Sequence, residues 1–296
     1  MKVYLTFDVE IWCNGWDDLD GRFPSSFERY VYGRSRHGDY ALPKTLEILA
    51  GTGLTGVFFV EPLFAARFGL EHLATIVALI QPKRHDIQLH LHPEWTDEIR
   101  PLVFPGAYRK RQHLSHYTFA EQCTLLTLGR TLLADAGANT PTAFRAGSFA
   151  ANADTYRALN TCGIRTDSSL NGVHPDSGID LRGKIDFFHP VEIDNTRVLP
   201  MTVFRDGTGR LRPAQVGACS FPEMRTALES AAANGVEHFV VLSHNFEMLK
   251  PDRSVPDAIV VRRFQHLCAY LAANRDRYQV RTLVERPEIT SHHTST

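Results

Sequence analysis

Two histidines in the stretch DIQLHLHP, residues 86 to 93, could hold a metal ion. The stretch is typical of a buried strand that ends at Pro93, and His90 and His92 stand two residues apart in it. Side chains alternate between the two faces of a strand, so both imidazoles point to the same side. Such a pair beside a turn is a good chelate for a divalent ion, although a histidine in the core is an equal alternative. If a metal binds here, a carboxylate ligand, a base and an acid should stand elsewhere in the chain.

Polar residues also end four other expected strands. TFDVE places Asp8 and Glu10 on one face of the first strand, Arg145 ends PTAFR, Asp167 ends GIRTD, and His244 ends EHFVVLSH. Each residue alone has an ordinary explanation, as a helix cap, a surface residue or a satisfied core histidine. In a parallel barrel, however, the carboxyl ends of the strands lie on the face where active sites form. Their coincidence at five strand ends predicts one site.

The chemistry that these residue types support is the hydrolysis of an amide. Two histidines and one carboxylate, from Glu10 or Asp8, can hold a catalytic divalent ion and leave positions open for water and substrate. The ion lowers the pKa of its water toward about 7, and the second carboxylate takes the proton. His244 could protonate the departing nitrogen while Asp167 orients its imidazole, and Arg145 could fix the ionised base through a bidentate pair.

Short apolar runs alternate along the chain with segments of helical spacing. This rhythm favours a parallel sheet that is closed or nearly closed into a (β/α) barrel over an open doubly wound sheet. No linker or internal repeat divides the chain, so we expect one domain, a catalytic barrel at 1–285 followed by a polar tail at 286–296. The expected strands are 2–7, 55–60, 86–91, 141–145, 163–167, 237–244 and 278–283, and the expected helices are 43–51, 71–80, 119–137, 152–163, 221–235 and 256–275.

Two long segments, 12–41 and 93–117, have no clear periodicity, and the region 170–217 is mixed and should hold short strands. Segments this long in a compact domain are usually functional or disordered. The first contains Trp12, Trp16 and further aromatic residues, which is too aromatic for disorder. It is either a surface on which sugar rings stack or a loop that packs its own aromatic side chains against the barrel.

Composition limits the partners and the compartment. A net charge of -1 over 296 residues gives no electrostatic basis for binding nucleic acid or an anionic membrane. No apolar run approaches the roughly 20 residues of a membrane helix. The 5 cysteines are scattered without a CxxC pair, which fits a reducing compartment. With a strand and no apolar leader at the beginning, a cytoplasmic protein is expected.

The order of these motifs resembles that of the polysaccharide deacetylase superfamily, also called the NodB-homology or carbohydrate esterase family 4 group. TFDVE resembles its first motif, RHDIQLHLHP the second, FRAGSF the arginine motif, DSSL the aspartate motif and LSHN the last. The resemblance implies a metal-dependent N-deacetylase on a distorted (β/α) barrel of about seven strands. It implies Asp8 as the base and Glu10 as a metal ligand with His90 and His92, although the roles of the two carboxylates could be exchanged.

The sequence departs from the pattern of that superfamily at three places. The first motif usually has two adjacent aspartates, whereas Val9 separates the two carboxylates here. The second motif usually spaces its histidines four apart rather than two. The arginine motif usually continues with proline and an aromatic residue, and here it reads Gly147, Ser148, Phe149. We therefore expect a groove unlike that of chitin or peptidoglycan enzymes, with Trp12, Trp16, Phe149 and Asn245 as substrate contacts.

The HLHPEW and LSHNFEM stretches are similar to those of deacetylases from bacterial O-antigen biosynthesis clusters. We predict a metal-dependent hydrolase, with Zn as the expected ion, that removes an N-acetyl group from an amino sugar or a nucleotide- or lipid-linked sugar precursor. The alternatives are hydrolysis of a non-sugar amide or formamide, and a non-catalytic saccharide-binding relative. Retention of both a base candidate, Asp8, and an acid candidate, His244, favours catalysis. The sequence does not specify the oligomeric state.

Overall fold

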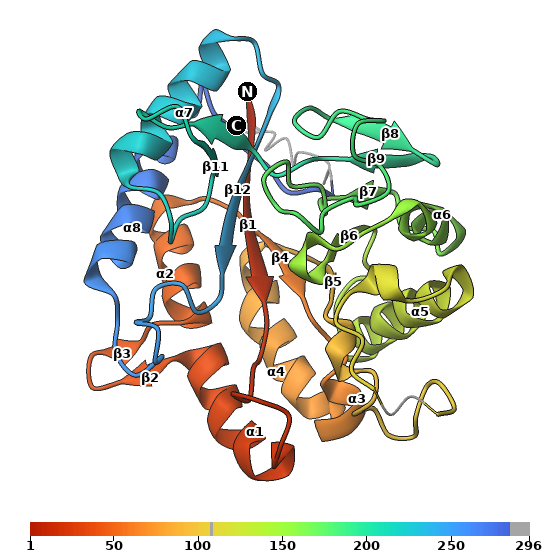
Figure 1. Ribbon diagram of the computed structural model, residues 1–296. Coiled ribbons are helices and arrows are strands. Elements are labelled where there is room, and N and C mark those ends of the chain that lie inside the picture. Colours follow the sequence, from red (N-terminus) through yellow and green to blue (C-terminus); the bar gives the residue numbers. More distant parts are fainter. Residues whose placement is uncertain (107–108, 285–296) are drawn as a thin grey trace, which may run out of the picture.

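One curled, mainly parallel sheet forms the centre of the chain (Figure 1). The computed structural model describes residues 1–106 and 109–284. Within them the strand order is β12-β1-β4-β5-β6-β7-β9-β8, β13 pairs with β1, and β8 with β9 is the antiparallel pair. Parallel pairing brings the carboxyl ends of the strands to one face. The strands are β1 (Lys2–Val9), β4 (Val57–Val60), β5 (Asp86–Leu91), β6 (Ala143–Ala146), β7 (Thr166–Asp167), β8 (Val191–Ile193), β9 (Thr196–Val198), β12 (His238–His244) and β13 (Gln279–Val280).

Helices cover the outside of this sheet, as the apolar spacing predicted (Figure 1). Helix α5 (Phe119–Asp135) shows why its boundary lies where it does. The Thr118 hydroxyl accepts the backbone N–H of Glu121, and the Glu121 carboxylate accepts the backbone N–H of Thr118, which satisfies two otherwise unpaired donors. The remaining helices are α1 (Leu19–Phe27), α2 (Leu42–Thr52), α3 (Ala65–Phe68), α4 (Leu70–Ile80), α6 (Ala153–Thr161), α7 (Phe221–Ala233) and α8 (Ala258–Ala273).

The expected strands and helices are all present, and the predicted fold class is confirmed as a half-open version of the (β/α) barrel. Two expected strands are short, because β7 and β13 each extend over 2 residues. Two short hairpins stand outside the main sheet, β2 (Arg34–Ser35) with β3 (Gly38–Asp39), and β10 (Val203–Arg205) with β11 (Leu211–Pro213).

The aromatic segment 12–41 is not a loop throughout. It contains α1 and a π-helix at Glu28–Tyr32, which the missing periodicity did not predict. Phe23, Phe27 and Tyr30 are buried in the main core, and the ring of Phe23 stacks on Phe68 with centroids 3.8 Å apart. These three aromatic side chains therefore pack against the barrel, which is the second of the two alternatives expected for this segment. Segment 93–117 contains 3-10 turns at Pro93–Trp95 and Leu114–His116.

A seam separates β12 from the β9 side of the sheet. Among residues 1–106 and 109–284, no strand ladder joins the two sides. Segment 200–216 fills the seam instead, with irregular backbone bonds such as Leu242 N–H to the Ala214 carbonyl at 2.9 Å and Val216 N–H to the Leu242 carbonyl at 3.0 Å. The sheet is thus continuous from β12 through β1 to β8, and the other edge of β12 is bonded to segment 200–216, which includes the β10–β11 hairpin.

Strands from both ends of the chain share this one sheet, since β1 pairs with β12 and with β13. The polar tail predicted at 286–296 lies outside the described residues, so the boundary at 285 stays a prediction. No helix within the described part of the chain is long and apolar enough to cross a membrane.

Candidate metal centre

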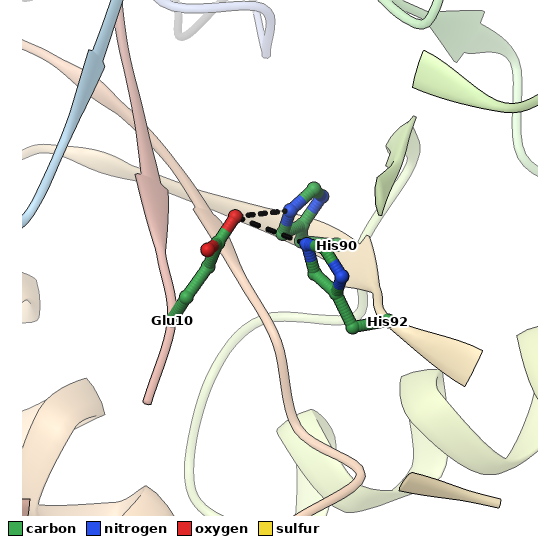
Figure 2. Close-up of side chains that lie close together, drawn as sticks. All are labelled: Glu10, His90 and His92. Carbon is green, nitrogen blue, oxygen red and sulfur yellow. Dashed lines mark hydrogen bonds and ion pairs between the residues drawn. The ribbon is translucent and has the colours of Figure 1, made fainter. Parts of the chain in front are cut away.

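Glu10, His90 and His92 meet at the carboxyl ends of β1 and β5 (Figure 2). The Oε1 atom of Glu10 lies 3.1 Å from His90 Nε2 and 3.0 Å from His92 Nε2. All three residues are buried, at 7%, 1% and 6% exposure respectively. The alternation of side chains along β5 brings both imidazoles to the same face, as the two-residue spacing predicted.

The donor set of this triad fits a divalent cation. His90 Nδ1 lies 2.7 Å from the backbone carbonyl oxygen of Arg145, so Nδ1 carries a proton and donates it. In the neutral ring, Nε2 then directs a lone pair at the carboxylate of Glu10, which is repulsive unless a cation lies between them. Tetrahedral ligands with bonds of about 2.0 to 2.1 Å stand about 3.3 Å apart, close to the separations found here.

The second histidine is held by a carboxylate and by close backbone packing. His92 Nδ1 lies 3.3 Å from Glu94 Oε2, an arrangement that orients metal-binding imidazoles in proteins. A Cβ atom at Gly147 would lie 2.7 Å from His92 Nδ1, so only glycine lets the ring occupy this position. Burial lowers the pKa of His92, but the charges and hydrogen bonds of Glu10 and Glu94 raise that pKa well above its ordinary value.

Glu10 is fixed at both its side chain and its backbone. Trp12 Nε1 donates to Glu10 Oε2 at 2.7 Å. The Asn245 amide accepts the backbone N–H of Glu10 at 3.1 Å and donates to its carbonyl at 3.2 Å. Burial raises the pKa of Glu10, but the charge of His92 and the hydrogen bonds of both histidines hold that pKa well below its ordinary value. Glu10 is therefore ionised at neutral pH and could serve as a metal ligand.

The other carboxylate of β1, Asp8, lies beside the arginine of the third motif. Arg145 Nη1 donates to Asp8 Oδ1 at 2.6 Å, and the guanidinium also donates to Thr6 Oγ1 at 3.0 Å. Arg145 is fully buried at 0% exposure, and its remaining donors contact the carbonyl and hydroxyl of Ser168. The predicted partnership is present, but through one guanidinium nitrogen rather than two.

His244 lies on the open side of this group. Its Nε2 atom is 4.0 Å from Glu10 Oε1, and its side chain is 23% exposed, against 8% for Glu10. Asp8, Glu10 and His244 offer ligand atoms that lie within 4.8 Å of one another. Burial lowers the pKa of His244, but the hydrogen bond to Glu247 and the nearby carboxylates raise that pKa to about 9.

The structure corrects the predicted partner of His244. His244 Nδ1 bonds Glu247 Oε1 at 2.9 Å. Asp167 instead accepts the backbone N–H and hydroxyl of Ser169, at 2.8 and 2.5 Å, and the hydroxyl of Tyr156 at 3.3 Å. In the part of the chain that the structure describes, no hydrogen bond or ion pair joins Asp167 to His244. Burial raises the pKa of Asp167 to about 6, and its bonds stabilise the start of the loop after β7.

The four expected substrate contacts have different surroundings. Asn245 is buried and uses its amide on the backbone of Glu10 and on the Tyr30 carbonyl, at 2.6 Å, so it joins strand ends rather than facing a substrate. Trp12 and Trp16 are half-buried and meet edge to face, 6.2 Å apart. The Trp12 ring also meets His92, at 4.8 Å. Phe149 is half-buried beside His174 at 5.4 Å, farther along the rim.

Three carboxylates that lie near the site were not predicted from the sequence. Glu61 follows β4, Glu94 follows the histidine pair, and Glu247 stands three residues after His244. Glu61 follows an expected strand end, so the rule that found Asp8 could have found it. Glu94 and Glu247 stand within motifs that the sequence reasoning quoted, but a carboxylate two or three residues from a histidine predicts a contact only when the turn between them is known.

Glu61 gives a pH-dependent prediction for stability. It is 1% exposed, one of its oxygens accepts the backbone N–H of Leu63 at 2.9 Å, and burial raises its pKa from 4.5 to about 8. The folded state therefore holds a proton that the unfolded state has lost between these values. Its contribution to the free energy of unfolding should fall by up to about 1.4 kcal/mol per pH unit from pH 4.5 to 8.

We expect Glu61→Gln to remove this dependence. In metal-free protein, urea unfolding should show the variant and wild type within about 1 kcal/mol at pH 5, and the variant more stable by roughly 2 to 4 kcal/mol at pH 8. Glu71→Gln, at a side chain that is 74% exposed, is the matched control and should follow wild type at both pH values. A Glu61→Gln curve parallel to wild type contradicts the prediction.

Comparison with solved structures places this fold among known proteins. No family model and no curated protein matches the sequence. A structure from Mycobacterium smegmatis, provisionally described as a polysaccharide deacetylase, matches with a TM-score of 0.53 and 19% identity, covering 97% of this chain and 94% of that one. The Puue allantoinase matches with a TM-score of 0.54 and 14% identity, covering 95% and 87%.

A family 4 carbohydrate esterase from Streptomyces lividans, solved in complex with acetate, has a lower TM-score of 0.46 at 13% identity, with 96% and 93% coverage. The two matches with TM-scores above 0.5, at 19% and 14% identity, establish the fold and leave activity to the site. The fold expected from the motif resemblance is therefore confirmed over nearly the full chain, and the buried Glu10, His90, His92 group fits a divalent metal ion.

Proposed function

We propose that this protein is a metal-dependent amidohydrolase that removes an N-acetyl group from an amino sugar or sugar precursor. The observation that carries the proposal is that three sets of side chains lie together at one end of the sheet. These are a Glu10, His90, His92 ligand group, a second carboxylate on Asp8, and an imidazole on His244 at the open side. A binding protein has no need of the last two, so catalysis is favoured over the saccharide-binding alternative.

When bound, a divalent ion supplies Lewis acidity, lowering the pKa of water toward about 7 and polarising the substrate carbonyl. Asp8 accepts the proton of the attacking water, and its bond to Arg145 orients the carboxylate. His244 Nε2 gives its proton to the departing nitrogen as the C–N bond breaks. The products are acetate and a free amine.

Zinc is the ion we propose. Two imidazole nitrogens and one carboxylate oxygen form a typical catalytic zinc set, which leaves a fourth position open. Half-buried Trp12 and Trp16 beside this group support a sugar as the substrate, since sugar rings stack on aromatic faces. The link to O-antigen synthesis and the cytoplasmic location stay predictions that rest on sequence.

Hydrolysis of a non-sugar amide is the second candidate. The fold similarity to the Puue allantoinase, named for action on allantoin rather than on a sugar, favours it. The same base, acid and ligand group could perform that reaction. The two candidates differ in the substrate that releases product.

A substrate panel tests the proposal directly. Protein purified without chelating resin is incubated with N-acetylated amino sugars, nucleotide-linked N-acetyl sugars, allantoin and simple formamides, and acetate, formate and ureido products are measured. We expect acetate from at least one sugar, and loss of that activity after treatment with a chelator. Product from the non-sugar amides alone identifies the second candidate, and absence of any product contradicts both.

Metal content is expected to depend on His90. Wild type should hold close to one divalent ion per chain, and His90→Ala should retain less than about a tenth of it, because one of three protein ligands is lost. Elemental analysis of both proteins, after dialysis against metal-free buffer, measures this. His85→Ala is the matched control: it removes a buried histidine at the opposite end of β5, which bonds the Gly56 N–H, and it should keep the ion. Equal metal content in wild type and His90→Ala contradicts the ligand assignment.

A further inference from the structure

The carboxylate of Glu247 is built into the turn that follows β12. Its Oε1 atom accepts from His244 Nδ1 at 2.9 Å and contacts the Gln215 side-chain amide. Its Oε2 atom accepts the Gly217 N–H at 2.8 Å and the Ser243 hydroxyl at 3.2 Å. Both oxygens are thus occupied, and the Glu247 side chain is 8% exposed. Four donors around one buried carboxylate hold it in place.

This arrangement decides which nitrogen of His244 faces the site. Both carboxylate oxygens of Glu247 accept hydrogen bonds from neighbouring donors, so His244 Nδ1 donates its proton to Oε1. The Nε2 atom then points the other way, toward Glu10 Oε1 at 4.0 Å. In the imidazolium form a second proton is carried on Nε2, where it faces a group bound beside the Glu10 side chain, while Nδ1 stays bonded to Glu247.

The support for Glu247 comes from the loop that fills the seam. Gln215 bridges to Leu242 of β12, which sets the position of the loop against the strand. A Cβ atom at Gly217 would lie 3.0 Å from Glu247 Oε2, closer than ordinary side-chain contacts. Glycine therefore lets the Gly217 N–H approach the carboxylate closely.

We propose that Glu247 is the positioning residue of the general acid, which it holds with Nδ1 bonded and Nε2 directed at the departing nitrogen. The inference rests on the proposed amide hydrolysis, in which the C–N bond breaks and the nitrogen takes its proton from Nε2. Without Glu247 the ring is free to rotate, and the imidazolium, which carries protons on both nitrogens, loses the acceptor at Nδ1 that stabilises it and directs Nε2 at the departing nitrogen.

Leaving-group dependence distinguishes this role from a structural one. An amine must be protonated to leave, whereas 4-nitrophenolate leaves unaided. We expect Glu247→Gln to lower kcat for the amide substrate by about 100-fold with little change in KM. Hydrolysis of 4-nitrophenyl acetate should fall by less than about 3-fold, and metal content should not change. Asp186→Asn is the matched control, because Asp186 holds His189 Nδ1 at 2.7 Å in an exposed loop, and it should leave both reactions unchanged.

Nitrogen-15 NMR of the His244 ring gives a readout that does not need activity. Wild type should show a slowly exchanging Nδ1–H proton on His244, and Glu247→Gln should lose it. His244 observed without a proton on Nδ1 in wild type overturns the inference whatever the protein hydrolyses. Equal losses on the ester and the amide in Glu247→Gln overturn it too, while leaving the proposed function intact. Wild type that hydrolyses no amide contradicts the proposed function, and the inference falls with it.

Discussion

Asp8→Asn should lower kcat by at least about 1,000-fold while the protein keeps its metal ion. Asp8 bonds Arg145 at 2.6 Å and does not share in the contacts of His90 and His92, which go to Glu10. An asparagine preserves the shape and still accepts from Arg145, but it cannot take a proton from water. Activity on the substrate found in the panel and metal content by elemental analysis are measured on the same preparation.

Glu10→Gln is the paired variant that makes this test decisive. It removes the charge that both histidines contact, so we expect loss of the ion together with loss of activity. The motif resemblance left the two carboxylate roles exchangeable, and the pair of variants separates them. If Asp8→Asn loses the ion and Glu10→Gln keeps it, the roles are exchanged.

Arg145→Met should lower the free energy of unfolding by about 3 to 5 kcal/mol. The guanidinium is fully buried and stands over the ring of Phe59 at 4.3 Å, so the variant leaves the carboxylate of Asp8 buried without its cation. Methionine retains most of the volume, which limits the cavity contribution. Urea unfolding of metal-free protein at pH 7 measures the change.

A double variant shows whether the unpaired charge is the cause. The double variant Asp8→Asn with Arg145→Met no longer contains the unpaired buried carboxylate. It should therefore be more stable than Arg145→Met alone by roughly 1 kcal/mol or more. A double variant that is less stable than Arg145→Met means that packing around the guanidinium, rather than the unpaired charge, carries the effect.

The polar side chains at the strand ends could be predicted from the sequence, because their positions follow from side-chain alternation along each strand and from parallel pairing between strands. Alternation along a strand puts His90 with His92 and Asp8 with Glu10, and parallel pairing brings β1, β5 and β12 to one face. These steps need no knowledge of loops. The meeting of the two histidines with a carboxylate from Glu10 or Asp8 could therefore be predicted from the sequence.

The partner of His244 could not be found in this way. The choice between Asp167 and Glu247 depends on the turn after β12 and on the loop that brings Gln215 and Gly217 against it. Neither has a periodic signature. For the same reason Asn245 was predicted to contact the substrate, although its amide joins the end of β12 to the end of β1.

The seam beside β12 divides the site into two parts with different backbone support. Glu10 directly follows a strand that is paired on both edges and His90 stands on another, whereas His244 ends a strand whose second edge meets segment 200–216 through irregular backbone bonds. Local opening follows the weakest backbone pairing, so we expect the amide hydrogens on the His244 side to exchange at a lower free energy of opening than those on the Glu10 side. Under the proposed function, changes in the seam loop could then tune proton delivery without disturbing ion binding.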